Sequence, residues 1–208
     1  TYKTVGYAER PINQSSVIIG TLGVKRHNPD RFTLEVLNEI LGGGGFSSRL
    51  YKEVRTRLGL AYWVGTSFYE PYDLGIIAAG CQTKNTAVAQ TIKAILSEFR
   101  RIRTEKVTDE ELKHAKNSIN NSFVFRYSSP QAIVVQKMNQ DYYAYPPDYL
   151  ETYTQKISAV TPDQILAAAQ KYYDPETFTL MVVGNAKEFD LQLSTFGPVR
   201  HADLKIPE

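Results

Sequence analysis

Arg55 and Tyr62 are the two residues of this chain whose types and spacing could do chemistry together. In "RTRLGLAY", Arg55 lies near the end of a predicted helix, Gly59 turns the chain, and Tyr62 opens a predicted strand. A tight corner of this kind can bring both side chains onto one side. A guanidinium fork and a phenol hydroxyl both donate hydrogen bonds, so the pair suits a peptide carbonyl or a developing oxyanion. The alternative is an exposed helix arginine beside an unrelated strand tyrosine.

A glycine run stands before this corner and raises a different chemistry, the binding of phosphate by backbone N–H groups. A P-loop ends in lysine followed by serine or threonine, and a dinucleotide-binding loop directly follows a strand. Neither condition holds, because this run follows a predicted helix and ends in phenylalanine and serine. We therefore interpret it as a loop that ends one helix and frees the next, and both substrate contact and close packing stay open as its role. Its residues are Gly42, Gly43, Gly44, Gly45, Phe46 and Ser47.

The histidines and the cysteine show no spacing that would hold a metal ion. His27, His114 and His201 are isolated, and neither H-x-x-E-H nor H-x-x-x-H occurs. A zinc site would need ligands that converge from distant segments. Cys81 is the sole cysteine, so neither an internal disulfide nor a cysteine zinc cluster can form. We expect no metal and no cofactor in this chain and interpret the histidines as surface or capping residues.

Composition excludes several classes of protein. The chain has 208 residues, of which 42% are hydrophobic and 22% are charged, as in an ordinary globular protein. Its net charge of +2 indicates neither a nucleic-acid partner nor a basic membrane surface. Apolar runs such as "GIIAAG" are far shorter than the roughly 20 residues of a membrane span. The start of the chain carries no apolar signal core and no methionine, so we expect a fragment or processed product, and its localisation stays open.

The elements that must position the corner follow from local patterns in the first half of the chain. Asn28 before Pro29 predicts a helix start, and the glycine run predicts its end. Ser47 can cap a second, short helix over 48–58, which Gly59 ends. β-Rich segments predict strands at 15–24, 61–69 and 74–82, with the last two joined as an antiparallel hairpin around "EPYD".

The second half is mostly helical. An apolar stripe from Val88 to Ile102 predicts one helix, and "SP" at 129–130 and the segment 148–158 predict two more. Two capping boxes mark further starts: Thr108 with Glu111, and Thr161 with Gln164. A last strand is expected at 178–183. The layout predicts an α+β fold, with one mostly antiparallel sheet covered on one face by helices, and a single domain over 1–208.

Tyrosines are dense in "DYYAYPPDYL" at 141–150. A platform for stacking nucleic-acid bases would carry basic residues between the rings, and this segment has none. We therefore interpret the tyrosines as half-buried rings with hydroxyls at the rim.

The segment "LGGGGFSSRLYKEVRTRLGLAYWV" resembles the C-terminal-domain motif of the pitrilysin/insulinase zinc metallopeptidases, in the mitochondrial-processing-peptidase-like branch. The pattern continues upstream in "NQSSVIIGTLG" and "PDRFTLEVLNEILGG". It continues downstream in "VTDEELKHAKNSI" and "YDPETFTLMVVGNA", so the resemblance covers nearly the whole chain. In that family a zinc domain carries H-x-x-E-H, and a similarly folded domain supplies an arginine and, seven positions later, a tyrosine that reach the substrate across a closed chamber. Arg55 and Tyr62 occupy those positions.

The resemblance implies the non-zinc partner domain of a metallopeptidase, because the zinc motif is absent from this chain. Arg55 would fix the backbone of a peptide substrate and Tyr62 would bond its carbonyl oxygen. Zinc would lie in an H-x-x-E-H domain of the same polypeptide or of a partner chain, in a dimer or two-domain clamshell. This chain alone would then be inactive. The rival is a structural or assembly domain, since non-catalytic core subunits of the respiratory bc1 complex use the same fold. A small-molecule hydrolase has no supporting catalytic group here.

Overall fold

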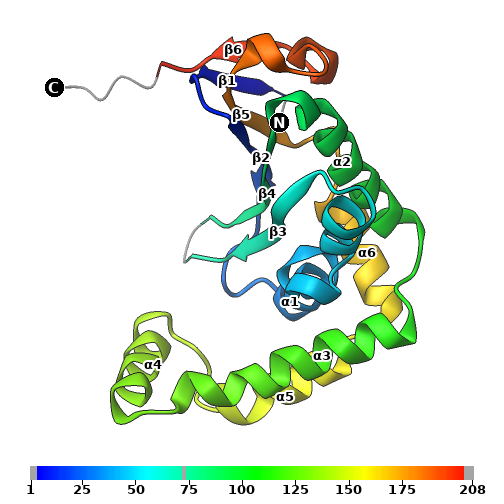
Figure 1. Cartoon of the computed structure of the whole chain (residues 1–208). Coiled ribbons are helices and arrows are strands. Elements are labelled where there is room, and N and C mark those ends of the chain that lie inside the picture. Colours follow the sequence, from blue (N-terminus) through cyan, green and yellow to red (C-terminus); the bar gives the residue numbers. More distant parts are fainter. Residues whose placement is uncertain (1–3, 72–73, 204–208) are drawn as a thin grey trace, which may run out of the picture.

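A six-stranded sheet forms the centre of the fold, with the strands in the order β3, β4, β2, β5, β1, β6 (Figure 1). The computed structural model describes residues 4–71 and 74–203. Pairing is antiparallel from β3 through β4 and β2 to β5, and parallel from β5 through β1 to β6. The predicted α+β fold with a mostly antiparallel sheet is therefore confirmed. The strands are β1 (Val5–Glu9), β2 (Gln14–Leu22), β3 (Ala61–Tyr69), β4 (Ile76–Lys84), β5 (Thr179–Gly184) and β6 (Val199–His201).

The predicted strands and the antiparallel β3–β4 hairpin are confirmed, with β4 displaced by two residues toward the C-terminus. Part of the "EPYD" turn, residues 72–73, lies outside the described residues. Strands β1 and β6 were not predicted. β1 contains a glycine and an alanine, which weaken its local signal, and β6 is only three exposed residues long. Both strands form because a parallel neighbour from the other end of the chain supplies their hydrogen bonds.

Helices α1, α2 and α6 lie on the same side of the sheet (Figure 1). Helix α2 packs on β2 and β4, and α6 packs between α1 and α2. Under them the rings of Phe99, Tyr173 and Phe178 meet with centroids 4.9–6.3 Å apart, and all three side chains are buried. No described helix is both long and apolar enough to cross a membrane. The α-helices are α1 (Arg31–Asn38), α2 (Val88–Thr104), α3 (Asp109–Phe123), α4 (Pro130–Tyr142), α5 (Tyr149–Ala159) and α6 (Pro162–Tyr172).

Helices α3 and α5 form an arm beyond the sheet. They contact each other along their lengths, and α4 sits at the far end of the arm (Figure 1). Phe123 of α3 stacks on Tyr153 of α5, with ring centroids 4.2 Å apart and planes 11° from parallel. Tyr153 is fully buried, so this pair anchors the arm against α1, where Phe32 meets the same ring edge-on.

The first helix differs from the prediction at both ends. It begins at Arg31 with Asp30 as its N-cap, and the side-chain oxygen of Asn28, two residues before Asp30, accepts a hydrogen bond from the Asp30 N–H at 2.8 Å. The glycine run does not stop the helix at Gly42. The α-helix ends at Asn38, and the wider π-helix η1 (Glu39–Gly43) carries the chain into the run. Glycines permit this widening because they have no side chain to crowd the turn.

The second predicted helix is also mostly a π-helix, η3 (Tyr51–Arg57). Its start is held by Ser48 rather than Ser47, because the Ser48 hydroxyl accepts from the Tyr51 N–H at 3.4 Å. The hydroxyl of Ser47 donates instead to the carbonyl of Gly44 at 2.9 Å. Both predicted capping boxes, at the starts of α3 and α6, are confirmed.

A partly buried ion pair joins the residues just before η3 to the start of the arm. The Arg49 guanidinium, only 6% exposed, donates from Nε and Nη2 to the two carboxylate oxygens of Glu111 at 2.7 and 2.8 Å. Glu111 also accepts from the Thr108 N–H at 2.9 Å as part of the α3 capping box. Burial alone would raise the pKa of Glu111, but these hydrogen bonds outweigh it and lower the pKa to about 2.

We expect this pair to make stability depend on pH. A carboxyl whose pKa falls on folding stabilises the protein above its unfolded pKa, and this stabilisation is lost as the pH falls toward the folded value. The free energy of unfolding of the wild type should therefore exceed that of Glu111→Gln by roughly 3 kcal/mol near neutral pH. This difference should shrink as the pH falls from about 4.5 to 2. Urea titrations followed by circular dichroism at several pH values would measure it.

Glu110→Gln is the matched control, because Glu110 is exposed in the same helical turn. It should change the unfolding free energy far less. A difference between wild type and Glu111→Gln that stays constant down to pH 2 would contradict the ion pair as its cause.

Candidate functional site

Arg55 sits on the π-helix η3, which widens directly before the corner. The Leu58 N–H donates to the Glu53 carbonyl at 3.0 Å, and the Leu60 N–H donates to the Val54 carbonyl at 2.9 Å. These bonds span five and six residues instead of the four of an α-helix. Gly59 then takes a φ of +63°, in the left-handed region that favours glycine, and the chain turns into β3. π-Helical turns occur frequently at functional sites.

Tyr62 is aimed by a β-bulge at the start of β3. Ala61 pairs with Thr83 and Trp63 pairs with Gln82, so Tyr62 is the extra residue on its strand. A bulge re-aims side chains, and both Tyr62 and Trp63 are exposed here although neighbouring residues of a strand normally face opposite sides. Since β3 is an edge strand, the bulge lies at the border of the sheet.

The structure brings Arg55 and Tyr62 together. The Arg55 guanidinium carbon lies 4.6 Å from the centroid of the Tyr62 ring, 4.7 Å from that of Tyr51 and 5.5 Å from that of Phe46. Cation–π attraction to three rings restricts the side chain without using its N–H groups. Tyr62 is 81% exposed and Phe46 is 78% exposed, so the group faces outward. We call Phe46, Tyr51, Arg55 and Tyr62 the arginine corner.

Tyr51 is the member of the arginine corner that the sequence analysis missed. It stands four residues before Arg55, a spacing that places two side chains on one helical face, and this signal could have found it. Its hydroxyl is buried and has no hydrogen-bond partner among the described residues. The ring of Phe46 packs against it with centroids 4.6 Å apart, so the tip of the glycine loop is fastened to η3.

The glycine run packs closely at its start and is exposed at its tip. A Cβ on the buried Gly42 would lie 2.4 Å from the backbone nitrogen of Thr66, so only glycine lets η1 touch β3 there. Gly45 has a φ of +56° and open space around it. Gly43 is exposed, and Gly44 and Ser47 are partly buried. Close packing thus accounts for the start of the run, and the tip is free to contact another molecule.

The residues described by the structure form no group of histidine, cysteine and carboxylate side chains that could hold a metal ion. The Nε2 atom of His27 lies 2.8 Å from the backbone carbonyl oxygen of Tyr143, and His201 meets the ring of Tyr7 edge-on. Cys81 is buried, and burial raises the pKa of its thiol to about 12. These side chains therefore offer no converging ligands for zinc.

Comparison with known proteins gives a consistent picture. Residues 3–119 match the family model described as "Peptidase M16 inactive domain". The chain is 30% identical over 193 residues to an uncharacterized zinc protease of Streptomyces coelicolor, covering 90% of this chain and 41% of that protein. It is 27% identical over 183 residues to one of Rickettsia felis, covering 86% and 43%. The chain thus spans about two fifths of the length of these two relatives.

Solved structures agree with the sequence comparison. The crystal structure of a peptidase M16 inactive domain from Pseudomonas fluorescens matches with a TM-score of 0.82 and 30% identity, covering 88% of this chain and 44% of that chain. A chain of Complex III2 from Candida albicans matches with a TM-score of 0.79, covering 94% and 48%. Its identity is only 13%, so this second likeness concerns the fold alone.

The close packing of Gly42 leads to a test that needs no activity. Gly42→Ala should lower the free energy of unfolding by roughly 3 kcal/mol, because the added methyl group meets the backbone of β3. Gly45→Ala, in the same run, should cost only roughly 1 kcal/mol, since its methyl group meets nothing and only the positive φ is unfavourable. Denaturant titrations of both variants would compare them. Equal losses would argue against the packed contact between η1 and β3.

Proposed function

Because the chain belongs to the peptidase M16 family, in which it matches the inactive domain, we propose that it clamps a peptide substrate for a zinc-bearing domain located elsewhere. It is a non-catalytic domain of the type found in zinc proteases, and we treat residues 1–208 as one such domain. The observation that carries the proposal is the arginine corner: an arginine held between aromatic rings beside an exposed tyrosine hydroxyl.

Arg55 and Tyr62 contact different parts of the substrate in this proposal. The Arg55 guanidinium packs beside the rings of Tyr51 and Tyr62, and its N–H groups would donate to backbone carbonyls of the substrate. The Tyr62 hydroxyl donates to the carbonyl oxygen at or beside the scissile bond, where negative charge develops. A zinc ion in the other domain would supply Lewis-acid chemistry at that bond. The exposed tip of the glycine run would border the substrate.

The partner in this proposal is an H-x-x-E-H domain of the same polypeptide or of a second chain, and the two halves form a closed clamshell. The substrate is a peptide or another unfolded segment, because a closed chamber admits no folded protein. The length of the zinc-protease relatives, more than twice the matched part, supports the existence of such a second half in those proteins.

An assembly role is the second candidate, and the likeness to the Complex III2 chain favours it. In that role the residues of the arginine corner would contact no substrate. The two candidates differ in what they expect of the exposed Tyr62 hydroxyl: a clamp needs the hydroxyl during turnover, and an assembly domain does not.

Substitutions in the arginine corner separate the two candidates. With the zinc half present, Tyr62→Phe should lower turnover by roughly 10²–10³, the loss typical of one oxyanion-type donor, because the ring still packs on Arg55. Arg55→Ala should raise the Michaelis constant and lower turnover. Arg55→Lys should restore little, because an ammonium group cannot reproduce the planar fork. Steady-state kinetics beside thermal melts would measure these effects.

Tyr69→Phe is the matched control, because Tyr69 is exposed at the other end of the same strand. It should leave the kinetics unchanged. If Tyr62→Phe and Arg55→Ala also leave the kinetics unchanged, the substrate-clamp proposal is wrong and the assembly role is favoured.

The chain by itself should neither retain zinc nor cleave peptides. The described residues offer no converging ligands, so dialysed protein should contain far less than stoichiometric zinc by elemental analysis. A fluorogenic peptide assay with and without a chelator would check the activity. Cleavage by the pure chain that a chelator stops would place the zinc site in this chain. It would contradict the proposal that zinc is held by another domain.

A further inference from the structure

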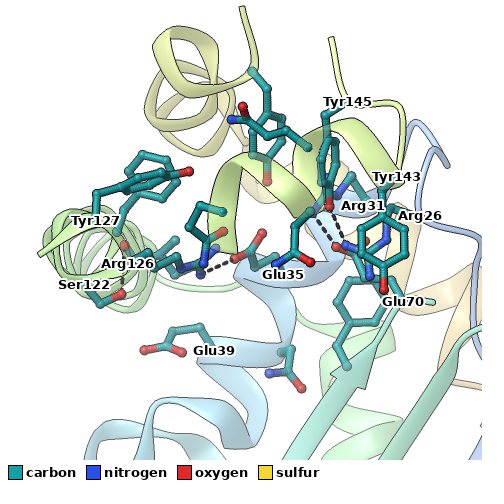
Figure 2. Close-up of a pocket in the computed structure, with 18 residues that line it drawn as sticks. Arg26, Arg31, Glu35, Glu39, Glu70, Ser122, Arg126, Tyr127, Tyr143 and Tyr145 are labelled. Atoms are coloured by element: carbon teal, nitrogen blue, oxygen red, sulfur yellow. Dashed lines mark hydrogen bonds and ion pairs between the residues drawn. The ribbon is translucent and has the colours of Figure 1, made fainter. Parts of the chain in front are cut away.

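A polar cavity of about 490 Å³ lies between α1, the end of β3 and the outer part of the arm (Figure 2). Phe68 and Glu70 line it from β3 and the residue just after it, whereas Tyr62 stands at the start of that nine-residue strand. None of the residues of the arginine corner lines it. The cavity is therefore a second feature, at the opposite end of the edge strand, and its volume is that of a small-ligand site.

Cationic groups outnumber carboxylates on one side of this cavity. Arg31 forms an ion pair with Glu70, and Arg26 also faces Glu70 (Figure 2). Among the described residues Arg26 has no carboxylate within ion-pair distance. Its guanidinium lies 3.8 Å from the centroid of the Tyr143 ring and donates to the Tyr145 hydroxyl. Two arginines thus face the Glu70 carboxylate, Glu35 acts on Arg31 from farther away, and tyrosine rings pack against both guanidinium groups.

Several buried polar atoms of the lining have no hydrogen-bond partner within the described protein. One of these atoms is Nε of Arg31, whose side chain is only 9% exposed. Buried polar groups without a hydrogen-bond partner destabilise a protein unless a water molecule or a ligand bonds them. Both donors and acceptors are present, so a ligand that bonds them both accepts and donates, and the side chains turn toward the cavity to meet it, because these atoms have almost no exposed surface. The atoms are Nε of Arg26, Nε of Arg31, Nε2 of Gln140, Oδ1 of Asn38 and Oε2 of Glu70.

Helix α4 closes the cavity with its polar face. Gln136, Asn139 and Gln140 line the cavity, whereas Val134 and Met138 on the outer face are 58% and 64% exposed. A surface helix usually turns its apolar side inward. No residue of α4 is buried, so packing does not explain the inversion. A polar wall here is explained if the space behind it receives a polar ligand.

We propose that this cavity binds a short peptide segment that carries a carboxylate. Arg26 and Arg31 receive the carboxylate, Asn38 and Glu70 accept peptide N–H groups, and Gln140 donates to a peptide carbonyl. Glu35 and Glu39 also line the cavity, and they would repel a doubly charged phosphate about twice as strongly as a singly charged carboxylate. The inference deepens the proposed function, since it adds a second contact for an unfolded chain beyond the arginine corner.

The test is equilibrium binding to the pure chain, measured by isothermal titration calorimetry with three pentapeptides. The first is acetyl-Gly-Ser-Glu-Ser-Gly-amide, with a side-chain carboxylate. The second replaces glutamate by glutamine and has a free carboxyl terminus. The third has glutamine and an amidated end, and carries no carboxylate. One of the first two should bind at least about tenfold more tightly than the third, because a charge-assisted hydrogen bond is lost. Whichever binds identifies the source of the carboxylate.

Arg26→Gln should remove this preference, and Arg100→Gln, an exposed arginine of α2 outside the cavity, should keep it. Gln140→Leu, on the unburied helix α4, should weaken all three peptides and serves as the test if Arg26→Gln does not fold. Equal affinity for the three peptides, no binding at all, or full binding in the Arg26 and Gln140 variants would overturn the proposal. The titrations involve no zinc domain and no cleavage, so their failure is separate from failure of Arg55 and Tyr62 in turnover.

Discussion

The bidentate contact between Arg49 and Glu111 is the constraint on which the rest of the structure depends. Arg49 lies two residues before the π-helix that carries Arg55, and Glu111 belongs to the capping box that starts the arm. This pair therefore links the segment that leads into the arginine corner to the first turn of α3. Removing one partner would leave an uncompensated buried charge, which is costly. The segment that carries Arg55 and the start of the arm are thus joined directly by this contact.

Local signals in the sequence predicted much of this fold. Thr108 with Glu111 and Thr161 with Gln164 are capping boxes whose partners lie three residues apart, and both form as expected. The β3–β4 hairpin follows from alternating residues on either side of a turn. Arg55 and Tyr62 could be singled out because the turn that brings them together is encoded in the few residues between them.

Other features depend on contacts between distant segments and left no local signal. The π-helical widening at Arg55 occurs where η3 packs against β3, and the bulge at Tyr62 occurs where β3 pairs with β4. The tyrosine segment at 141–150 carries no basic residues of its own, yet its rings meet Arg26, which lies 119 positions from Tyr145. The prediction of half-buried tyrosines holds for Tyr143 and Tyr145, whereas Tyr142 is exposed and Tyr149 is buried. It could not include the cations that complete the cavity.

The order of the strands has a mechanical consequence. β1 and β6 are parallel neighbours from opposite ends of the chain, joined by bonds from the Val5 N–H to Pro198 and from the Ala202 N–H to Tyr7, at 3.1 and 2.7 Å. Tension between the start of β1 and the end of β6 would slide the two strands past each other. Their hydrogen bonds would then bear the load together instead of opening one at a time. A domain stretched between these two points would meet its first resistance at this short outer ladder, before the antiparallel strands are disturbed.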